Sequence, residues 1–308
     1  MAAITAKMVS DLRAKTNAGM MECKKALSEA DGNFDEAIKI LRERGLATAA
    51  KKAGRIAAEG VVDIMIEGNT AVMIEVNSET DFVAKNATFK EFVAGIEKVI
   101  LANKPADIDA LMALPYDAES TVDAKLKEMI AIIGENMHIR RFQVVEGVMA
   151  HYIHGAGTTG VIVKFNADDA AANNPGFAEF AKNIALQIAA GNPPAYVCRE
   201  QVPASAVEEE KQILITQMKN DPKNANKPDS ILDKIVTGKL GKFYERVCLV
   251  DQPYVKDDDL SVGKYIETCA KEFGGSISVD SFYLYEKGEG LEKREDNFGD
   301  EIAELLNH

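Results

Sequence analysis

The chain has 308 residues, a formal net charge of −13 and a hydrophobic content of 46%. This length exceeds what a single hydrophobic core usually organises, so we expect about two domains. The acidic balance disfavours direct binding to nucleic acid, because that binding depends largely on Lys and Arg side chains that neutralise phosphates. A protein partner fits the charge better.

The sequence also disfavours a membrane protein, a secreted protein and a zinc protein. No apolar run reaches the roughly 18 residues that a membrane span needs, and the first residues lack the basic and apolar segments of a signal peptide. The four cysteines, Cys23, Cys198, Cys248 and Cys269, are far apart and form no C-x-x-C pair, which favours free thiols in a reducing compartment. We therefore expect a cytoplasmic protein without a metal site.

Residues 4–44 predict three short helices. An Asn-Ala-Gly and an Asp-Gly-Asn turn separate them, and Gly45 is expected to end the third. Residues 46–58 lack a clear apolar stripe and indicate a connecting helix or a linker. The two methionines at the start of the second helix, Met20 and Met21, are either core filler or an adaptable contact surface. The sequence leaves both alternatives open.

A β-hairpin and a junction follow. Two β-rich runs, 61–67 and 71–76, flank a Gly-Asn turn, and an amphipathic helix begins at a capping box of Thr88 and Glu91. Between them, the junction at 77–86 reads Asn-Ser-Glu-Thr-Asp-Phe-Val-Ala-Lys-Asn. A junction between strand and helix projects side chains outward, so we interpret it as the working tip of the protein.

The strand–turn–strand–junction–helix pattern occurs twice in the chain, which indicates an internal duplication. With one residue gained in the second turn, Asp81 corresponds to Asp169 and Phe82 corresponds to Ala170. A side chain that the unit needs for folding should have a large counterpart, so we interpret Phe82 as functional. Asp81 is less clear, because an aspartate present in both copies is equally explained as a helix cap.

The second copy contains a G-x-G-x-x-G motif at residues 155–160. A dinucleotide site needs this motif at the start of a helix. Here a strand follows, so we expect a hairpin turn and no bound cofactor. His151 and His154 point to opposite faces of a strand and lack a third ligand nearby in the sequence, which disfavours a metal site. His154, beside the turn, is expected at the surface.

Residues 191–245 interrupt the second unit. They predict two helices joined by a polar loop, which together form a protruding hairpin. This hairpin is either packed on the core or an arm for dimerisation or for a partner. A strand over 276–285 is expected to complete the second sheet, and a short helix over 300–306 lies near the end of the chain.

The predicted fold class is α+β, with antiparallel strands, packed helices and a duplicated core. We expect four parts in the chain. They are an N-terminal three-helix module at 1–54, a first core subdomain at 55–145, a second core subdomain at 146–285 that contains the inserted hairpin, and a C-terminal module at 286–308.

Several stretches of the sequence resemble bacterial elongation factor Ts. They are Leu-Arg at 12–13, Ala-Gly-Met-Met-Glu-Cys-Lys-Lys-Ala-Leu at 18–27, Thr-Asp-Phe-Val-Ala-Lys at 80–85, Ile-Gly-Glu-Asn at 133–136, Ile-Arg-Arg at 139–141 and His-Gly at 154–155. The resemblance runs nearly end to end, and the first region also resembles a ubiquitin-associated (UBA) type three-helix module. The chain departs from the family's short forms around 191–230, where it is longer.

The resemblance implies a guanine-nucleotide exchange factor for elongation factor Tu. Such a factor makes and breaks no covalent bond and is not an enzyme. The family's tip, which dislodges Mg²⁺ from the bound GDP, maps onto Thr80, Asp81, Phe82 and Val83.

Further partner contacts follow from the same resemblance. Met20, Met21 and Lys24 match positions that grip the nucleotide-binding domain of the GTPase. His154 matches a core residue that faces the other domains of the GTPase, and the C-terminal helix would touch the nucleotide domain. Family dimers form through the helical hairpin, so a homodimer through residues 191–245 stays open.

Two other classes of function remain as alternatives. A plain binding module would capture a protein through residues 1–54 and use the rest of the chain as a scaffold. An enzyme of small-molecule chemistry would depend on the G-x-G-x-x-G motif, and the strand that follows the motif argues against it.

Overall fold

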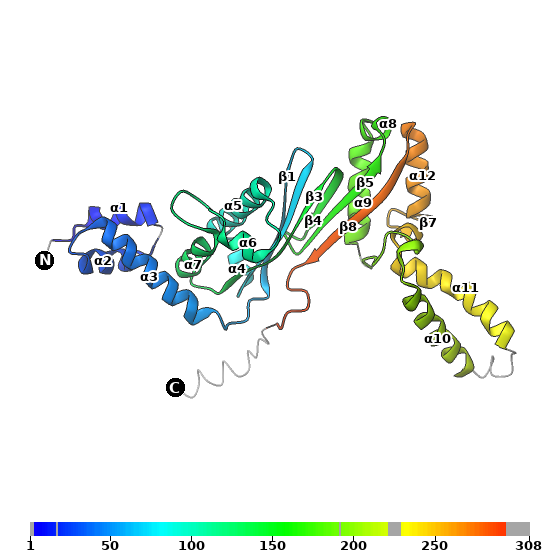
Figure 1. Ribbon diagram of the computed structural model, residues 1–308, viewed down its shortest axis with the longest axis horizontal. Coiled ribbons are helices and arrows are strands. Elements are labelled where there is room, and N and C mark those ends of the chain that lie inside the picture. The colour runs from blue at the N-terminus through cyan, green and yellow to red at the C-terminus, as the bar shows by residue number, and fades with distance from the viewer. Residues whose placement is uncertain (1–2, 17, 191, 221–228, 294–308) are drawn as a thin grey trace.

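The computed structural model describes residues 3–16, 18–190, 192–220 and 229–293. Over these residues the chain forms an N-terminal helical module, two three-stranded antiparallel sheets with packed helices, a small two-stranded sheet and a projecting pair of helices (Figure 1). The predicted α+β class is therefore confirmed. The terminal helix predicted at 300–306 lies outside the described residues.

The N-terminal module contains α1 (Ala6–Thr16), α2 (Met20–Glu29) and the first part of α3 (Phe34–Lys52). These helices share a small core of six buried side chains, namely Val9, Leu12, Cys23, Ala26, Leu27 and Ala37. Asn33 caps α3 by accepting hydrogen bonds from the backbone N–H groups of Asp35 and Glu36. The module stands at one end of the molecule (Figure 1).

The prediction that Gly45 ends the third helix is wrong. α3 continues to Lys52, and the segment predicted as a connecting helix or linker is largely its second half. Gly45 is buried against α7 (Val122–Ile133), where an added Cβ would lie 3.5 Å from the Cβ of Ala131. Glycine weakens a helix interior by only about 1 kcal/mol, and packing on α7 outweighs that cost.

The first sheet has the strand order β1-β2-β3, from β1 (Glu59–Glu67), β2 (Thr70–Ser78) and β3 (Met137–Glu146). The predicted Gly-Asn turn connects β1 to β2. Successive side chains of a strand point to opposite faces. Val72, Ile74 and Val76 of β2 accordingly pack in the helix-side core, whereas Ala71 and Met73 face the second sheet.

Four helices accompany the first sheet, namely α4 (Asp81–Lys85), α5 (Ala87–Asn103), α6 (Ile108–Ala113) and α7. The predicted capping box is wrong by two residues. α5 begins at Ala87, and the side chain of Asn86 caps it by accepting hydrogen bonds from the N–H groups of Thr88 and Phe89.

The second sheet repeats this arrangement with the order β4-β5-β8, from β4 (Val148–His154), β5 (Thr159–Ala167) and β8 (Ile277–Glu286). Its helices are α8 (Asp169–Ala172), α9 (Phe177–Ala189) and α12 (Val262–Phe273). The strand predicted at 276–285 completes this sheet, as expected. Both sheets also carry a register irregularity at corresponding places, between Glu75 and Val76 and between Lys164 and Phe165.

The turns of the two copies differ more than the sequence indicated. Two residues lie between β1 and β2, whereas four residues, 155–158, lie between β4 and β5. The second copy then has one residue fewer at its junction, because α8 follows a single N-cap residue, Asp168, and α4 follows Glu79 and Thr80. These differences restore the predicted correspondence of Phe82 with Ala170.

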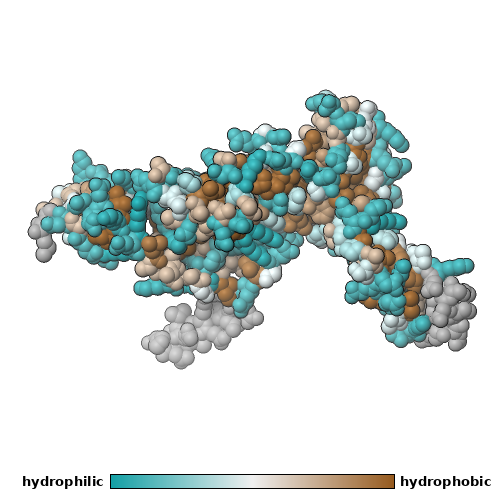
Figure 2. Space-filling model, in the orientation of Figure 1, coloured by the Kyte–Doolittle hydropathy of each residue, from teal (hydrophilic) through white to brown (hydrophobic). Residues whose placement is uncertain are grey.

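The two sheets pack on each other. The layer between them includes Val62, Ile64, Met73, Val145 and Ile162, all of which are buried. From one end of the long axis to the other, the core therefore consists of a layer of helices, two sheets and a second layer of helices (Figure 1). Most of the visible surface is hydrophilic, and hydrophobic residues gather over the sheets and along the projecting helices (Figure 2).

The projecting helices are α10 (Ala204–Asn220) and α11 (Asp229–Val247), and they confirm the predicted hairpin. The loop predicted between them, 221–228, lies outside the described residues. Short segments connect the hairpin to the second sheet, namely η1 (Arg199–Gln201), η2 (Leu249–Asp251), β6 (Pro253–Tyr254) and β7 (Asp257–Ser261). Among the described helices, none is long and apolar enough to cross a membrane.

Candidate functional site

The predicted tip is a one-turn helix that protrudes from the end of β2. α4 begins after Thr80 and ends at Asn86. Val83 is buried, with 5% of its surface exposed, and fixes the turn to the first core. Phe82 is 78% exposed, more than any other large hydrophobic side chain in the described part of the chain. The structure thus places the phenylalanine where the sequence predicted it, with its ring free to meet a partner.

The second copy presents a small residue at the same place. Ala170 is exposed at the second position of α8, as Phe82 is at the second position of α4, and the next residue, Ala171, is buried like Val83. The scaffold therefore needs an apolar residue after this position and makes no use of a ring at it. This agreement supports the interpretation that Phe82 has a role other than folding.

Asp81 is not a helix cap. Its carboxylate accepts a hydrogen bond from Lys85 Nζ at 2.7 Å, and this bond lowers the pKa of Asp81. The N-cap residue is Thr80, and in the second copy Asp168 rather than Asp169 caps the helix. Lys85 Nζ also lies 5.7 Å from the centroid of the Phe82 ring. Asp81, Phe82 and Lys85 thus form one charged and aromatic group on the surface.

The base of the tip is fastened to the turn between α7 and β3. Thr80 donates two hydrogen bonds to the Glu135 carboxylate, from its backbone N–H at 2.9 Å and from Oγ1 at 2.7 Å. Glu79 in turn accepts a hydrogen bond from the backbone N–H of Asn136. No role was predicted for these two glutamates from the sequence. Their hydrogen bonds join two segments that are far apart in the chain, and no local sequence pattern reveals such a contact.

The N-terminal site residues lie on the first turns of α2. Met20 and Met21 are 58% and 62% exposed, so the interpretation of these residues as core filler is wrong. Met21 and Lys24 line a shallow hollow together with residues further along α2. Cys23, between them in sequence, is buried in the small core. This face of α2 offers flexible apolar side chains beside a cation, which suits an adaptable protein contact.

His154 is the last residue of β4 and is exposed, as predicted. Its Nδ1 lies 3.2 Å from the Tyr152 hydroxyl. Val62 N donates to Gly157 O in the turn after His154, and β1 pairs with the end of β2 just before the tip. His154 and the tip therefore lie at the same end of the paired sheets, whereas α2 lies apart from both (Figure 1).

The glycine-rich motif and the cysteines are the remaining candidate sites in the sequence. The G-x-G-x-x-G motif is a hairpin turn, as predicted, in which Gly155 and Gly157 have positive φ. No group of three His, Cys, Asp or Glu side chains in the described residues could hold a metal ion. The four cysteines have free thiols.

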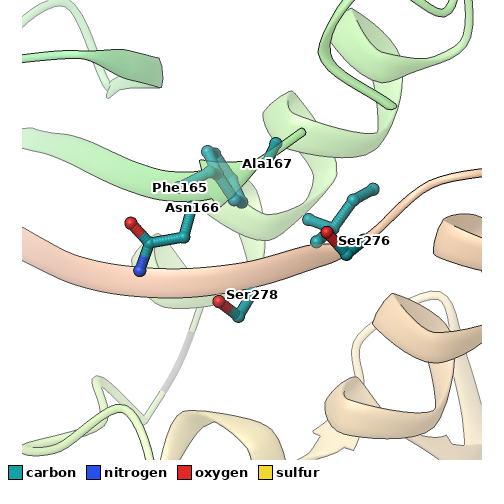
Figure 3. Close-up of a pocket in the computed structure, with 6 residues that line it drawn as sticks. Phe165, Asn166, Ala167, Ser276 and Ser278 are labelled. Atoms are coloured by element: carbon teal, nitrogen blue, oxygen red, sulfur yellow. The ribbon is translucent and has the colours of Figure 1, made fainter. Parts of the chain in front are cut away.

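One hollow lies where the end of β5 pairs with the start of β8 (Figure 3). Six residues line it, namely Phe165, Asn166, Ala167, Ser276, Ile277 and Ser278. None of these side chains is acidic or basic, so the hollow lacks the titratable groups of an acid–base site. It is therefore not the candidate functional site.

A buried glutamate stands near the tip on β2. Glu75 accepts hydrogen bonds from Gly288 N at 2.8 Å, Arg140 Nη1 at 3.0 Å and Arg141 Nε at 2.6 Å, and from Asn77 Nδ2 at 3.0 Å. Burial alone would raise the pKa of Glu75, but these donors together lower it. The cluster ties the segment after β8 to the first sheet. The signal in the sequence is a glutamate within an otherwise apolar strand.

Comparison with known proteins assigns the family. The family model for "Elongation factor TS" matches residues 79–289, a segment that contains the tip. The chain is 48% identical over 306 residues to the elongation factor Ts of Syntrophotalea carbinolica. This alignment covers 98% of this chain and 99% of the relative.

Two further relatives agree. The elongation factor Ts of Trichlorobacter lovleyi is 45% identical over 309 residues, and that of Clostridium botulinum strain Alaska E43 is 43% identical over 308 residues. Each alignment covers 98% of this chain, with 98% and 99% of the two relatives. The family match and these relatives therefore agree with one another. The chain belongs to the elongation factor Ts family.

Proposed function

We propose that this protein is a translation elongation factor that binds elongation factor Tu with GDP and promotes the exchange of GDP for GTP. Family membership supports the choice of partner. The observation that carries the mechanism is the exposed ring of Phe82 on a short helix, at a place where the second copy of the unit has alanine.

The proposed mechanism is conformational coupling. Nanomolar binding of GDP corresponds to about 12 kcal/mol, so unaided release is slow. A partner accelerates release only if it binds the nucleotide-free form better than the loaded form, and the coupling is reciprocal. The tip at Thr80–Val83 would supply this difference by inserting its ring into the GTPase, which displaces the elements that hold Mg²⁺ and lets GDP leave.

Within the tip, the residues have different parts. Phe82 and Asp81 are exposed and would contact the partner, with Phe82 as the wedge. Val83 is buried and Thr80 is bonded to Glu135, so these two would hold the wedge rather than touch the GTPase. The protein makes and breaks no covalent bond in this mechanism, so no catalytic residue is assigned.

Two further surfaces would complete the contact. Met20, Met21 and Lys24 on α2 are proposed to grip the nucleotide-binding domain, and His154 is proposed to face the other domains of the GTPase. Their separation in the structure suits a partner with several domains (Figure 1). A homodimer through the helical hairpin and a cytoplasmic location stay predictions.

Stopped-flow release of fluorescent GDP from elongation factor Tu tests the proposal. Wild-type protein should accelerate the release, and Phe82→Ala should reduce kcat/KM at least about tenfold, or about 1.4 kcal/mol of transition-state stabilisation. Val255→Ala, another exposed apolar side chain on the second subdomain, is the matched control. Equal rates for Phe82→Ala and wild type would contradict the proposed mechanism.

The same assay separates exchange from plain binding. Deleting residues 1–54 would remove the α3 face that packs on α7, so Met20→Ala combined with Met21→Ala is the cleaner change. A plain binding module would lose all effect on GDP release in this double variant. An exchange factor that acts through its tip would keep a weaker but measurable acceleration at high concentration.

A further inference from the structure

Two glutamates connect the base of the tip to the turn after α7. Glu135 follows Gly134, the C-cap of α7, which has a φ of +86°. Its carboxylate accepts both hydrogen bonds that Thr80 donates, at 2.9 Å from the backbone N–H and at 2.7 Å from Oγ1. Thr80 is the N-cap residue of α4 and stands two positions before Phe82. Glu135 therefore fixes the point at which the tip helix starts.

The second glutamate makes the connection reciprocal. Glu79 Oε1 accepts a hydrogen bond from the backbone N–H of Asn136 at 2.6 Å. Each carboxylate thus binds the backbone N–H of the residue that follows the other glutamate. Hydrogen bonds to a charged acceptor are shorter and stronger than those between neutral groups. Because they end on backbone atoms, they hold two chain segments in one relative position.

The surroundings of this clamp are ordered as well. Asn136 is buried, and its Nδ2 donates to Arg55 O at 2.8 Å. The Arg55 guanidinium lies 3.4 Å from Glu79 Oε1 and supplies a cation beside that carboxylate. The turn that carries Glu135 is therefore connected both to the tip and to the segment after α3.

The tip needs such support. α4 has five residues, and a helix of that length is unstable in isolation. Thr80 makes no side-chain cap hydrogen bond to α4, and its hydroxyl instead donates to Glu135. Val83 and the two glutamates hold the turn in place, so the exposed ring is positioned before a partner arrives. An ordered wedge avoids the loss of side-chain and loop freedom that binding otherwise costs.

In the second copy, the start of the corresponding helix is held by different contacts. There a single carboxylate, that of Asp168, caps α8 through Ala171 N and also accepts from the backbone N–H and the hydroxyl of Ser276. The start of β8 lies against it, since a Cβ on Gly275 would come within 2.2 Å of Asp168 Oδ1. The reciprocal pair of glutamates belongs to the copy that presents a phenylalanine.

We propose that Glu135 is a positioning residue for nucleotide exchange. It holds Thr80, with Glu79 as its reciprocal partner, so that Phe82 leaves the core in the direction that the GTPase receives. The inference rests on the proposed function, because the effect of the clamp on exchange has meaning only if the tip drives exchange.

Glu135→Gln is the test variant. The glutamine keeps the size of the side chain, but only its amide oxygen can accept, so one of the two bonds from Thr80 is lost. We expect kcat/KM for GDP release to fall about five- to tenfold, with faster amide hydrogen exchange at residues 82–85 and a nearly unchanged melting temperature. Glu128→Gln, on α7 and paired within the helix to Lys125, should match wild type.

A double-mutant comparison distinguishes positioning from a general loss of structure. In a Phe82→Ala background, Glu135→Gln should add almost no further loss, because its effect acts through the ring. A full additional loss in that background would overturn the inference, and so would wild-type exchange and amide protection in Glu135→Gln itself. If wild-type protein fails to accelerate GDP release, the proposed function fails instead.

A second variant covers the case in which Glu135→Gln does not fold. Thr80→Val removes the hydroxyl donor and leaves the backbone bond to Glu135 in place. It should reduce exchange about threefold and increase amide exchange at the tip to a smaller degree. Unchanged values of both quantities in a folded Thr80→Val protein would overturn the inference.

Discussion

The two copies of the duplicated unit share a scaffold and differ at its end. In the first copy, α4 carries the exposed Phe82 and is held from the side by Glu135. In the second copy, α8 carries Ala170, and the start of β8 bonds to its cap. Both copies bury the residue that follows. The comparison shows that folding requires the buried residue, whereas the exposed one is free to serve a partner.

The copies also differ in the charges at their register irregularity. Glu75 and Arg140 lie at this point in the first sheet, and Lys164 and Asp280 lie there in the second, with the signs reversed. The first pair is built on a carboxylate that is 0% exposed, and the second pair lies near the surface with 3.6 Å between its charged atoms. The same position can therefore hold a buried or a solvated ion pair.

The largest effect is expected when the buried ion pair of the first sheet loses its carboxylate. Glu75→Gln leaves Arg140 and Arg141 without their carboxylate, and removing one partner of a buried ion pair typically costs about 3–5 kcal/mol. We expect a loss of about 3 kcal/mol in the free energy of unfolding, measured with urea. Lys164→Gln is the matched control and should cost less than about 1 kcal/mol. Similar losses in the two variants would show that burial does not separate the pairs.

A second buried carboxylate distinguishes the copies and gives a pH-dependent prediction. Glu97 on α5 is buried where the second copy has the buried Ala185 on α9. Burial, with a smaller contribution from the Asp63 carboxylate, raises the pKa of Glu97 from its usual 4.5 to about 9. Glu97 therefore keeps its proton in the folded protein at neutral pH, whereas the unfolded chain loses it above about pH 4.5.

This difference in bound protons makes the folded protein less stable as the pH rises. The stability that neutral Glu97 provides is fully present below the unfolded pKa and is lost as the pH rises toward the folded value, at no more than about 1.4 kcal/mol per pH unit. Glu97→Gln lacks this titration. Relative to wild type, its free energy of unfolding should therefore improve by about 2 kcal/mol between pH 6 and pH 8. Parallel pH profiles of the two proteins would contradict the raised pKa.

Much of the scaffold could be predicted from the sequence, because it depends on local patterns. Alternating apolar residues predicted the strands, the recurrence of the junction predicted that Phe82 and Ala170 are equivalent, and the place of Phe82 between strand and helix predicted its exposure. One failure depends on a contact between distant segments, because Gly45 continues a helix where α7 packs against it. Another is local, since the Asn86 side chain caps α5 two residues before the predicted cap.

The site itself was predicted in part. The exposure of Phe82 was predicted from its position in the junction, whereas the exposure of Met20 and Met21 was left open and the glutamates that hold the tip were not detected. Glu79 and Glu135 look like ordinary surface acids in the sequence. No local pattern indicates that each accepts a hydrogen bond from the backbone N–H of the residue after the other glutamate. The buried Glu75 was open to detection, because a charge within an apolar strand needs partners when the strand is covered on both faces.

The central claim is that the exposed ring, and not the scaffold that both copies share, drives nucleotide release. The most direct measurement is stopped-flow GDP release from elongation factor Tu with Phe82→Ala, with Ala170→Phe and with the two changes combined. We expect Phe82→Ala to be slower by at least about tenfold, Ala170→Phe to match wild type, and the combined variant to be as slow as Phe82→Ala. Exchange at the wild-type rate by the combined variant would contradict the claim.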